Sequence, residues 1–218
     1  MLVPTSRTTV IDVGAPIDGT ERAAAWLKGA GDAELAAGLA VLNRALHAYR
    51  IASADPHAHG VGRNDALVAR IGYGAGEQVA DGLWTDAREL TDADRRRRRR
   101  IPAAQARLAA LLTGRESALV SEELALRARL DLDHAREREA ALQILVALDA
   151  AIAELAQDPA APALADRIEE LRGLRDAVAA AARKAASGPL GAPERHATEF
   201  ALGRIEAAVR ARAAALPG

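Results

Sequence analysis

The hydrophobic residues of this sequence are almost all small or aliphatic. Half of the 218 residues are hydrophobic, whereas only 2% are aromatic. The core must therefore be built from Leu, Val, Ile and a large number of Ala residues. Ala is the strongest helix former, and it loses no side-chain entropy when it packs. This composition favours closely packed helices, so we predict an all-α fold, a multi-helix bundle.

The first part of the chain predicts a lead-in followed by two helices. Residues 1–19 contain prolines and aspartates, and we expect them to be poorly ordered, with at most a short extended piece from Thr8 to Val13. A short helix is expected from Thr20 to about Lys28, and Asp32 is a candidate N-cap for a longer one. The apolar residues of the longer helix recur at spacings of three and four: Leu35, Leu39, Leu42, Leu46 and Tyr49.

Residues 67–80 allow two interpretations. Leu67, Ile71 and Val79 can share one helical face, and we favour a helix here. Three glycines would weaken that helix by about 1 kcal/mol each. The alternative is a short strand from Leu67 to Ile71 followed by a glycine turn.

Six consecutive arginines, Arg95 to Arg100, end the first half of the chain. Like charges in a block repel one another and stay solvated, and Pro102 disfavours helix at the residue before it. We therefore expect a smaller N-terminal helical domain at residues 20–94, an Arg-rich joint at 95–102 and a C-terminal helical bundle at 103–218.

The second half predicts four or five helices. Helices are expected at residues 103–112, 163–186 and 193–216, because Gly and Pro stand at their ends. Residues 116–157 form helix almost throughout, but their apolar pattern lapses between Asp131 and Glu139. We prefer an antiparallel hairpin with arms at 118–132 and 139–156 over a single long helix, which would need a continuous apolar seam.

Cysteine content and hydropathy are the features that predict where in the cell the protein is located. The sequence has no Cys, its first 20 residues lack the unbroken apolar stretch of a signal peptide, and no window reaches the roughly 20 apolar residues of a membrane span. We expect a cytoplasmic protein that is not inserted in a membrane.

Arg95, Arg96, Arg97, Arg98, Arg99 and Arg100 are a candidate nucleic-acid-binding element. Guanidinium groups that contact phosphates release counterions, so such a block can hold RNA or DNA without reading its sequence. The net charge of −1 gives no electrostatic argument that the chain as a whole binds nucleic acid. No aromatic residue that could stack on bases lies nearby. The other interpretation is a solvated linker.

Asp55, His57 and His59 form a candidate metal site. In an extended chain, His-x-His places both imidazoles on the same side, as a Zn²⁺ or Fe²⁺ ligand pair requires. An exposed turn has the same composition. We therefore predict no cofactor, and a metal-dependent enzyme stays a further alternative.

Arg129 and His134 are separated by four residues, and the pair resembles the Arg-(four to six residues)-His motif of the HEPN ribonucleases, which are small helical proteins. The resemblance implies RNA cleavage, with Arg steadying phosphate and His acting near the 2′-hydroxyl. The residue after Arg129 is Leu130, where that family usually has a polar one. The spacing also recurs at Arg50 and His57.

Gly72, Gly74 and Gly76 suggest a phosphate-binding loop. The dinucleotide fingerprint needs Gly-x-Gly-x-x-Gly, and the P-loop needs Gly-Lys-Ser/Thr; neither spacing is present here. A turn or a close helix crossing is the other interpretation.

Protein binding is the function that the helical pattern favours. Residues 135–142 resemble the turn and second-helix start of tetratricopeptide-like hairpins, which implies a protein-binding role. Broad Ala-rich helix faces suggest a homodimer. We therefore predict a non-enzymatic interaction or scaffold protein that binds a protein partner or itself. The alternative is a nucleic-acid-associated regulator.

Overall fold

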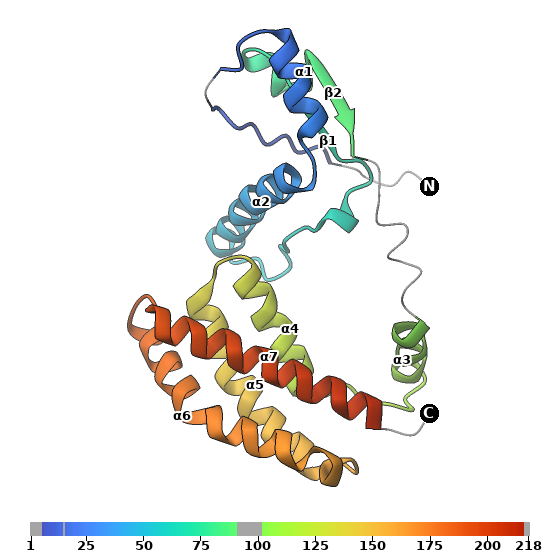
Figure 1. The fold of residues 1–218 in the computed structure, drawn as a ribbon, viewed down its shortest axis with the longest axis vertical. Helices are drawn as coiled ribbons and strands as arrows, with labels where there is room; N and C mark the ends of the chain where they lie inside the picture. Colours follow the sequence, from blue (N-terminus) through green and yellow to red (C-terminus); the bar gives the residue numbers. More distant parts are fainter. Residues whose placement is uncertain (1–5, 15, 91–101, 216–218) are drawn as a thin grey trace. The chain divides into compact units, whose positions relative to one another are not determined.

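The computed structural model describes residues 6–14, 16–90 and 102–215, and it describes the backbone alone at residues 102–106. The chain separates into two compact units, residues 1–100 and 101–218 (Figure 1). Within the described residues, the fold is mostly helical, with seven α-helices and one two-stranded sheet. The predicted multi-helix fold is confirmed.

The first unit opens with two helices, α1 (Thr20–Gly29) and α2 (Asp32–Ser53). The N-cap of α2 is Gly31 and not Asp32 as predicted, and the backbone N–H of Gly31 donates to Glu34 Oε2 at 2.6 Å. This bond is the main reason why the pKa of Glu34 is lowered. The predicted apolar stripe of α2 is only half covered in this unit, and the one fully buried residue of the helix is Asn43.

Asn43 joins α2 to the chain that returns from it. Its side-chain amide donates to Val61 O at 3.0 Å, and its Oδ1 accepts from Val61 N at 2.7 Å. These two hydrogen bonds resemble the pair that joins neighbouring strands in a sheet. They satisfy both the donor and the acceptor of the buried amide. A short 3₁₀ helix, η1 (Arg63–Asp65), follows.

Residues 67–80 are not a helix, so the favoured prediction for this segment was wrong. They contain the strand β1 (Arg70–Tyr73) and a 3₁₀ turn, η2 (Glu77–Val79), and β1 pairs antiparallel with β2 (Asp86–Glu89). The strand alternative was closer, although the strand begins three residues later than Leu67. Arg88 of β2 donates from Nε to Leu27 O at 2.8 Å and also to Ala30 O, so it satisfies carbonyls at the C-terminus of α1.

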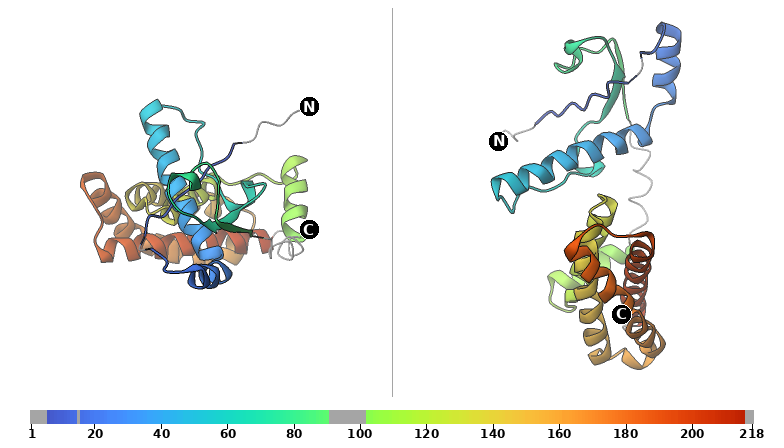
Figure 2. Two further views of the ribbon diagram at one scale, coloured as in Figure 1. Left: turned by 90° about the horizontal axis from the view of Figure 1, so that it is seen from above. Right: turned by 90° about the vertical axis from the view of Figure 1, so that its left-hand side faces the viewer.

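The second unit is a helical bundle preceded by a short helix, α3 (Pro102–Leu112). Figures 1 and 2 show its four long helices packed side by side. Their bounds are α4 (Val120–Asp133), α5 (Glu137–Gln157), α6 (Ala165–Ser187) and α7 (Ala192–Ala215), with a 3₁₀ turn, η4 (Ala161–Leu164), before α6. The two helices α4 and α5 confirm the predicted hairpin.

The bundle core combines large aliphatic side chains with a seam of Ala. Its largest fully buried residues include Ile144, Leu148, Leu202 and Ile205. Ala residues of α5, α6 and α7 lie between them at 0–1% exposure: Ala140, Ala147, Ala151, Ala181, Ala201 and Ala208. Small side chains let helix axes approach closely, and the Ala-rich faces therefore meet one another inside the bundle. In the described residues, no helix has the length and apolarity to cross a membrane.

Candidate interaction surface

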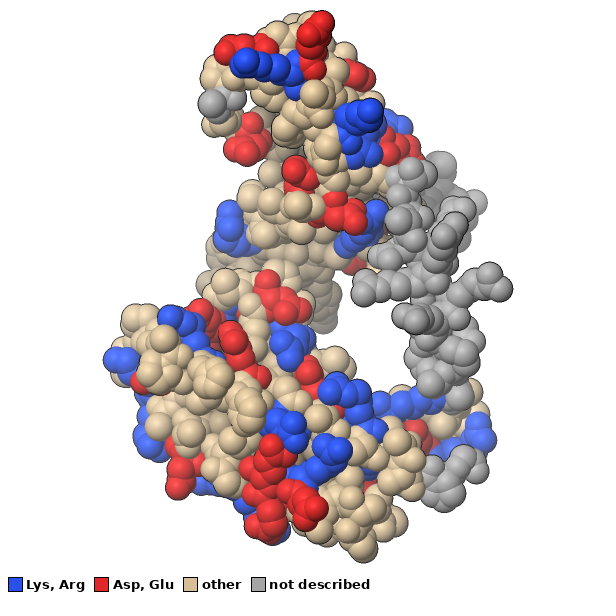
Figure 3. Space-filling model, in the orientation of Figure 1, with Lys and Arg blue, Asp and Glu red and all other residues tan. Residues whose placement is uncertain are grey.

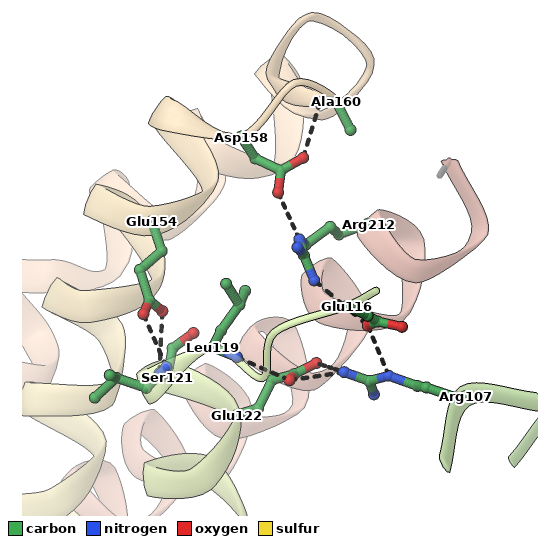
Figure 4. Close-up of polar contacts among 10 residues, drawn as sticks. Arg107, Glu116, Leu119, Ser121, Glu122, Glu154, Asp158, Ala160 and Arg212 are labelled. Carbon is green, nitrogen blue, oxygen red and sulfur yellow. Dashed lines mark hydrogen bonds and ion pairs between the residues drawn. The ribbon is translucent and has the colours of Figure 1, made fainter. Parts of the chain in front are cut away.

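A cluster of charged side chains closes one end of the bundle (Figure 4). Arg212 of α7 donates from Nε to Asp158 Oδ2 at 2.6 Å, and the two side chains are only 10% and 6% exposed. Asp158, which follows α5, also accepts from Ala160 N at 2.8 Å. The hydrogen bond from Arg212 is the main reason why the pKa of Asp158 is lowered. This pair ties the end of α5 to the end of α7.

Arg107 connects α3 to the same cluster. Its guanidinium donates to Glu116 at 2.9 Å and to both oxygens of Glu122 at 2.6 and 2.7 Å. Partial burial lowers the pKa of Arg107, but the hydrogen bonds that it donates to Glu122 and Glu116 outweigh this effect, and the net shift of the pKa is upward. Glu116 also lies 3.8 Å from Arg212 Nη1, so one carboxylate joins two arginines.

Glu154 of α5 caps the N-terminus of α4. Its two carboxylate oxygens accept from Val120 N at 2.8 Å and from Ser121 N at 3.0 Å, and Leu119 N donates to Glu122 at 3.1 Å. A carboxylate at this position satisfies free N–H groups and complements the helix dipole. The Ser121 hydroxyl beside it is fully buried and has no hydrogen-bond partner in the described part of the chain. The carboxylates of the cluster therefore have structural partners within the bundle.

Asp131 sets the register of the hairpin formed by α4 and α5. One of its oxygens accepts from Arg136 Nε at 2.6 Å, and the other accepts from Gln143 Nε2 at 2.6 Å. Because the two helices run antiparallel from a tight turn, residues near 131 on α4 lie level with residues near 143 on α5. One helical turn further from the loop, position 126 lies close to the level of position 146.

Four aliphatic side chains lie on the side of this hairpin that faces away from the core. Leu126 and Leu130 stand one turn apart on α4, and Leu142 and Val146 stand one turn apart on α5. They are 67%, 51%, 44% and 55% exposed, respectively. By the register set at Asp131, Leu130 and Leu142 lie within about two residues of the same level, and so do Leu126 and Val146. We call these four residues the outer face.

Exposed ion pairs also lie on α4 and α5. Glu123 and Arg127 pair on α4 at 2.8 Å, and Asp149 of α5 pairs with Arg175 of α6 at 2.8 Å. Basic and acidic side chains are interspersed over the described surface seen in Figure 3, so that view has no large field of one sign.

The predicted metal ligands do not come together. The Oδ1 of Asp55 accepts from the backbone N–H of His57 at 2.9 Å, which closes a turn after α2, and both His57 and His59 are exposed. Among the described residues, no group of three or more His, Asp or Glu side chains has a geometry that could hold a metal ion.

Arg129 and His134 have separate structural partners. Arg129 donates to both oxygens of Glu206 on α7 at 2.9 and 3.1 Å, and this hydrogen bonding is the main reason why its pKa is raised. His134 is the C-cap of α4, and its Nδ1 lies 2.8 Å from Leu130 O. The guanidinium that would steady a phosphate in the ribonuclease resemblance is therefore engaged with a carboxylate.

The glycine stretch has a structural role in the sheet. A Cβ at Gly72 would lie 2.6 Å from Ala87 Cβ and 2.8 Å from the Trp84 ring, and a Cβ at Gly74 would lie 2.6 Å from Val79 Cγ2. Gly76 has a φ of 69°, in the left-handed region. These glycines permit a close strand pair and a turn, so the turn interpretation is confirmed.

Arg95 to Arg100 lie outside the described residues. Their contact with nucleic-acid phosphates stays a prediction from the sequence.

The outer face has no single sequence motif. However, α5 has aliphatic residues on two opposite sides, and this pattern could have indicated the outer face.

Comparison with protein-family models, with curated proteins and with solved structures finds no match to this chain.

Proposed function

We propose that this chain is a non-enzymatic helical interaction protein that self-associates through the outer face of α4 and α5. One observation carries the proposal: four aliphatic side chains at similar levels on neighbouring helices are 44–67% exposed, while the opposite sides of the same helices are packed in the core. Large apolar side chains that are exposed on neighbouring helices are candidates for an interaction site.

The Ala-rich faces that first suggested a homodimer are not the surface of this proposal. They are buried within the bundle, where they bring α5, α6 and α7 together. The side chains left for a second copy are Leu and Val. These bury more apolar area per residue than Ala, which makes them better contact residues.

The expected affinity is low. Full burial of a Leu or Val side chain contributes about 1.5–3 kcal/mol, so covering the exposed half of eight such side chains contributes on the order of 8 kcal/mol. Association costs about 4–15 kcal/mol in lost translational and rotational freedom. At the lower end of that cost about 4 kcal/mol remains, and we therefore expect a weak dimer with a Kd of about 1 mM.

Sedimentation velocity of the full chain between about 10 μM and about 1 mM tests this proposal, because the range reaches the expected Kd of about 1 mM. The wild type is expected to gain mass with concentration. Leu130→Glu and Leu142→Glu should abolish the gain, because each places a charge at the centre of the apolar contact.

Leu67→Glu is the matched control. Leu67 is 83% exposed and belongs to the other unit, so the same change there should leave the mass unchanged. Circular dichroism checks that all variants keep their helix content. A wild type that stays monomeric at about 1 mM, the expected Kd, contradicts the proposal, and so does a loss of association that is equal in all three variants.

A further inference from the structure

The hydrogen bonding of the small sheet shows which backbone groups point outward. Leu90 N donates to Ala69 O at 2.9 Å, and residues 69 and 90 continue the antiparallel register that pairs Arg70 with Glu89 and Gly72 with Ala87. Hydrogen-bonded and non-hydrogen-bonded pairs alternate along such a ladder. The backbone groups of Arg70 and Gly72 on β1, and those of Ala87 and Glu89 on β2, therefore point away from the strand pair.

The two outer edges of the sheet are not equivalent. On β2, the backbone N–H of Ala87 donates to the Asp86 carboxylate at 2.8 Å, which blocks that edge, and Glu89 adds a second carboxylate. On β1, no backbone hydrogen bond joins the outward groups of Arg70 or Gly72 to another described residue. The β1 edge is open, and an open edge is a template for another strand.

The segment from Thr8 to Val13 has the composition of a strand but no strand partner. Five of its six residues are β-branched, which favours extended backbone. No backbone hydrogen bond links it to the described part of the chain. Its apolar side chains are exposed, namely Val10 (38%), Ile11 (45%) and Val13 (91%).

This segment does not run along the β1 edge of its own chain. Val10 Cβ lies 4.0 Å from the Cβ position of Gly38 on α2, and the Arg7 guanidinium lies 2.9 Å from the Cβ position of Gly82, beyond η2. An unpaired strand former and an unpaired strand edge are thus both present in one chain without meeting each other.

We propose that residues 8–13 of a second copy of this chain add antiparallel to the β1 edge, with Asp12 opposite Arg70 and Val10 opposite Gly72. In this register the outward backbone groups of Arg70 and Gly72 gain partners. Asp12 then faces the guanidinium of Arg70, whose side chain is 62% exposed. On the β2 edge it would face the carboxylates of Asp86 and Glu89.

The register also fits the side chains. Val10 lies on the same side of the sheet as Gly72, the side on which the Trp84 ring covers the glycine, so the two apolar side chains lie on one side of the sheet. Ile11 lies on the opposite side with Ile71 and Arg88, the side that faces α1. A two-fold pair of chains exchanges both segments and closes the contact. This inference does not depend on the proposed function of the bundle.

Amide hydrogen exchange, followed by NMR at 10 μM and 1 mM, tests the exchange of strands. The chain carries Leu130→Glu and Leu142→Glu, so that the outer face cannot associate. We expect protection of the amides of Val10, Asp12, Arg70 and Gly72 to rise about ten-fold with concentration. Val10→Pro should remove the rise, because it deletes an N–H that donates to β1.

Thr9→Pro is the control, because the N–H of Thr9 points away from β1 in this register. In this variant, amide protection should still rise with concentration. Protection that is absent at both concentrations would overturn the inference. Protection that is present but independent of concentration would mean that residues 8–13 pair within their own chain, and this result would overturn the inference as well. Equal loss in the two proline variants would reject the register and, with it, the inference.

Discussion

Replacing Arg212 by methionine is expected to lower the free energy of unfolding by about 3 kcal/mol. The guanidinium of Arg212 is the main partner of Asp158, whose side chain is only 6% exposed. Without it, the carboxylate keeps one hydrogen bond, from Ala160 N, and has little access to water. Removing one member of a buried ion pair costs more than the pair contributes, because the remaining charge is left uncompensated.

Urea unfolding followed by circular dichroism measures this loss. Arg175→Met is the matched control, because the Arg175–Asp149 pair has similar hydrogen-bond lengths but side chains that are 53% and 43% exposed. Exposed pairs contribute about 0–1 kcal/mol. Arg212→Met/Asp158→Asn should recover part of the loss, since no charge then remains buried. If Arg212→Met and Arg175→Met lowered the free energy of unfolding equally, burial would not be what makes the Arg212–Asp158 pair costly to break.

The same ion pair predicts how stability depends on pH. The pKa of Asp158 is lowered in the folded state, first by the hydrogen bond from Arg212 and then by the one from Ala160 N. The resulting stabilisation is fully present above the unfolded pKa of about 3.9, and it is lost as the pH falls through the folded value. The difference in unfolding free energy between wild type and Arg212→Met should therefore shrink below about pH 4. Urea titrations at pH 7, 5, 4 and 3 measure it, and a difference that stays constant with pH would contradict this cause.

The helices of the bundle could be predicted because their signals are local. The apolar spacing, the Pro and Gly punctuation, and the lapse between Asp131 and Glu139 all lie within the elements that they define. The hairpin turn falls inside that lapse, with α4 ending at Asp133 and α5 beginning at Glu137.

The helix was favoured over the strand because the determinants of the sheet are distant in the sequence. The aliphatic residues of segment 67–80 fit a helical spacing, and the reason for Gly72 is the closeness of Ala87 and Trp84, which lie more than ten residues later. A glycine that makes room for a cross-strand neighbour cannot be distinguished from a helix-weakening glycine until the pairing is known.

The polar cluster could not be predicted for a similar reason. Glu154 caps backbone groups that lie 33 and 34 residues before it, and Arg212 reaches Asp158 across 54 residues. Nothing local distinguishes these side chains in a sequence with many Arg and Glu residues. Of the residues that the sequence suggested as sites, Asp55 accepts a hydrogen bond within a turn and Arg129 pairs with Glu206.

Leu148→Ala is expected to cost about 3–4 kcal/mol of unfolding free energy, whereas Leu142→Ala on the same helix should cost less than about 1 kcal/mol. Leu148 is fully buried in the core of the bundle, and its truncation leaves a cavity that close-packed helices cannot collapse around. Leu142 is 44% exposed on the outer face, so solvent replaces the removed atoms.

Urea unfolding at a chain concentration of about 1 μM, far below the expected Kd of about 1 mM, compares the two variants without a contribution from association. The comparison separates the two sides of α5, because helix propensity changes equally in both variants. If Leu142→Ala were as costly as Leu148→Ala in the monomer, Leu142 would be a core residue. The outer face would then have no free apolar surface to offer a second copy.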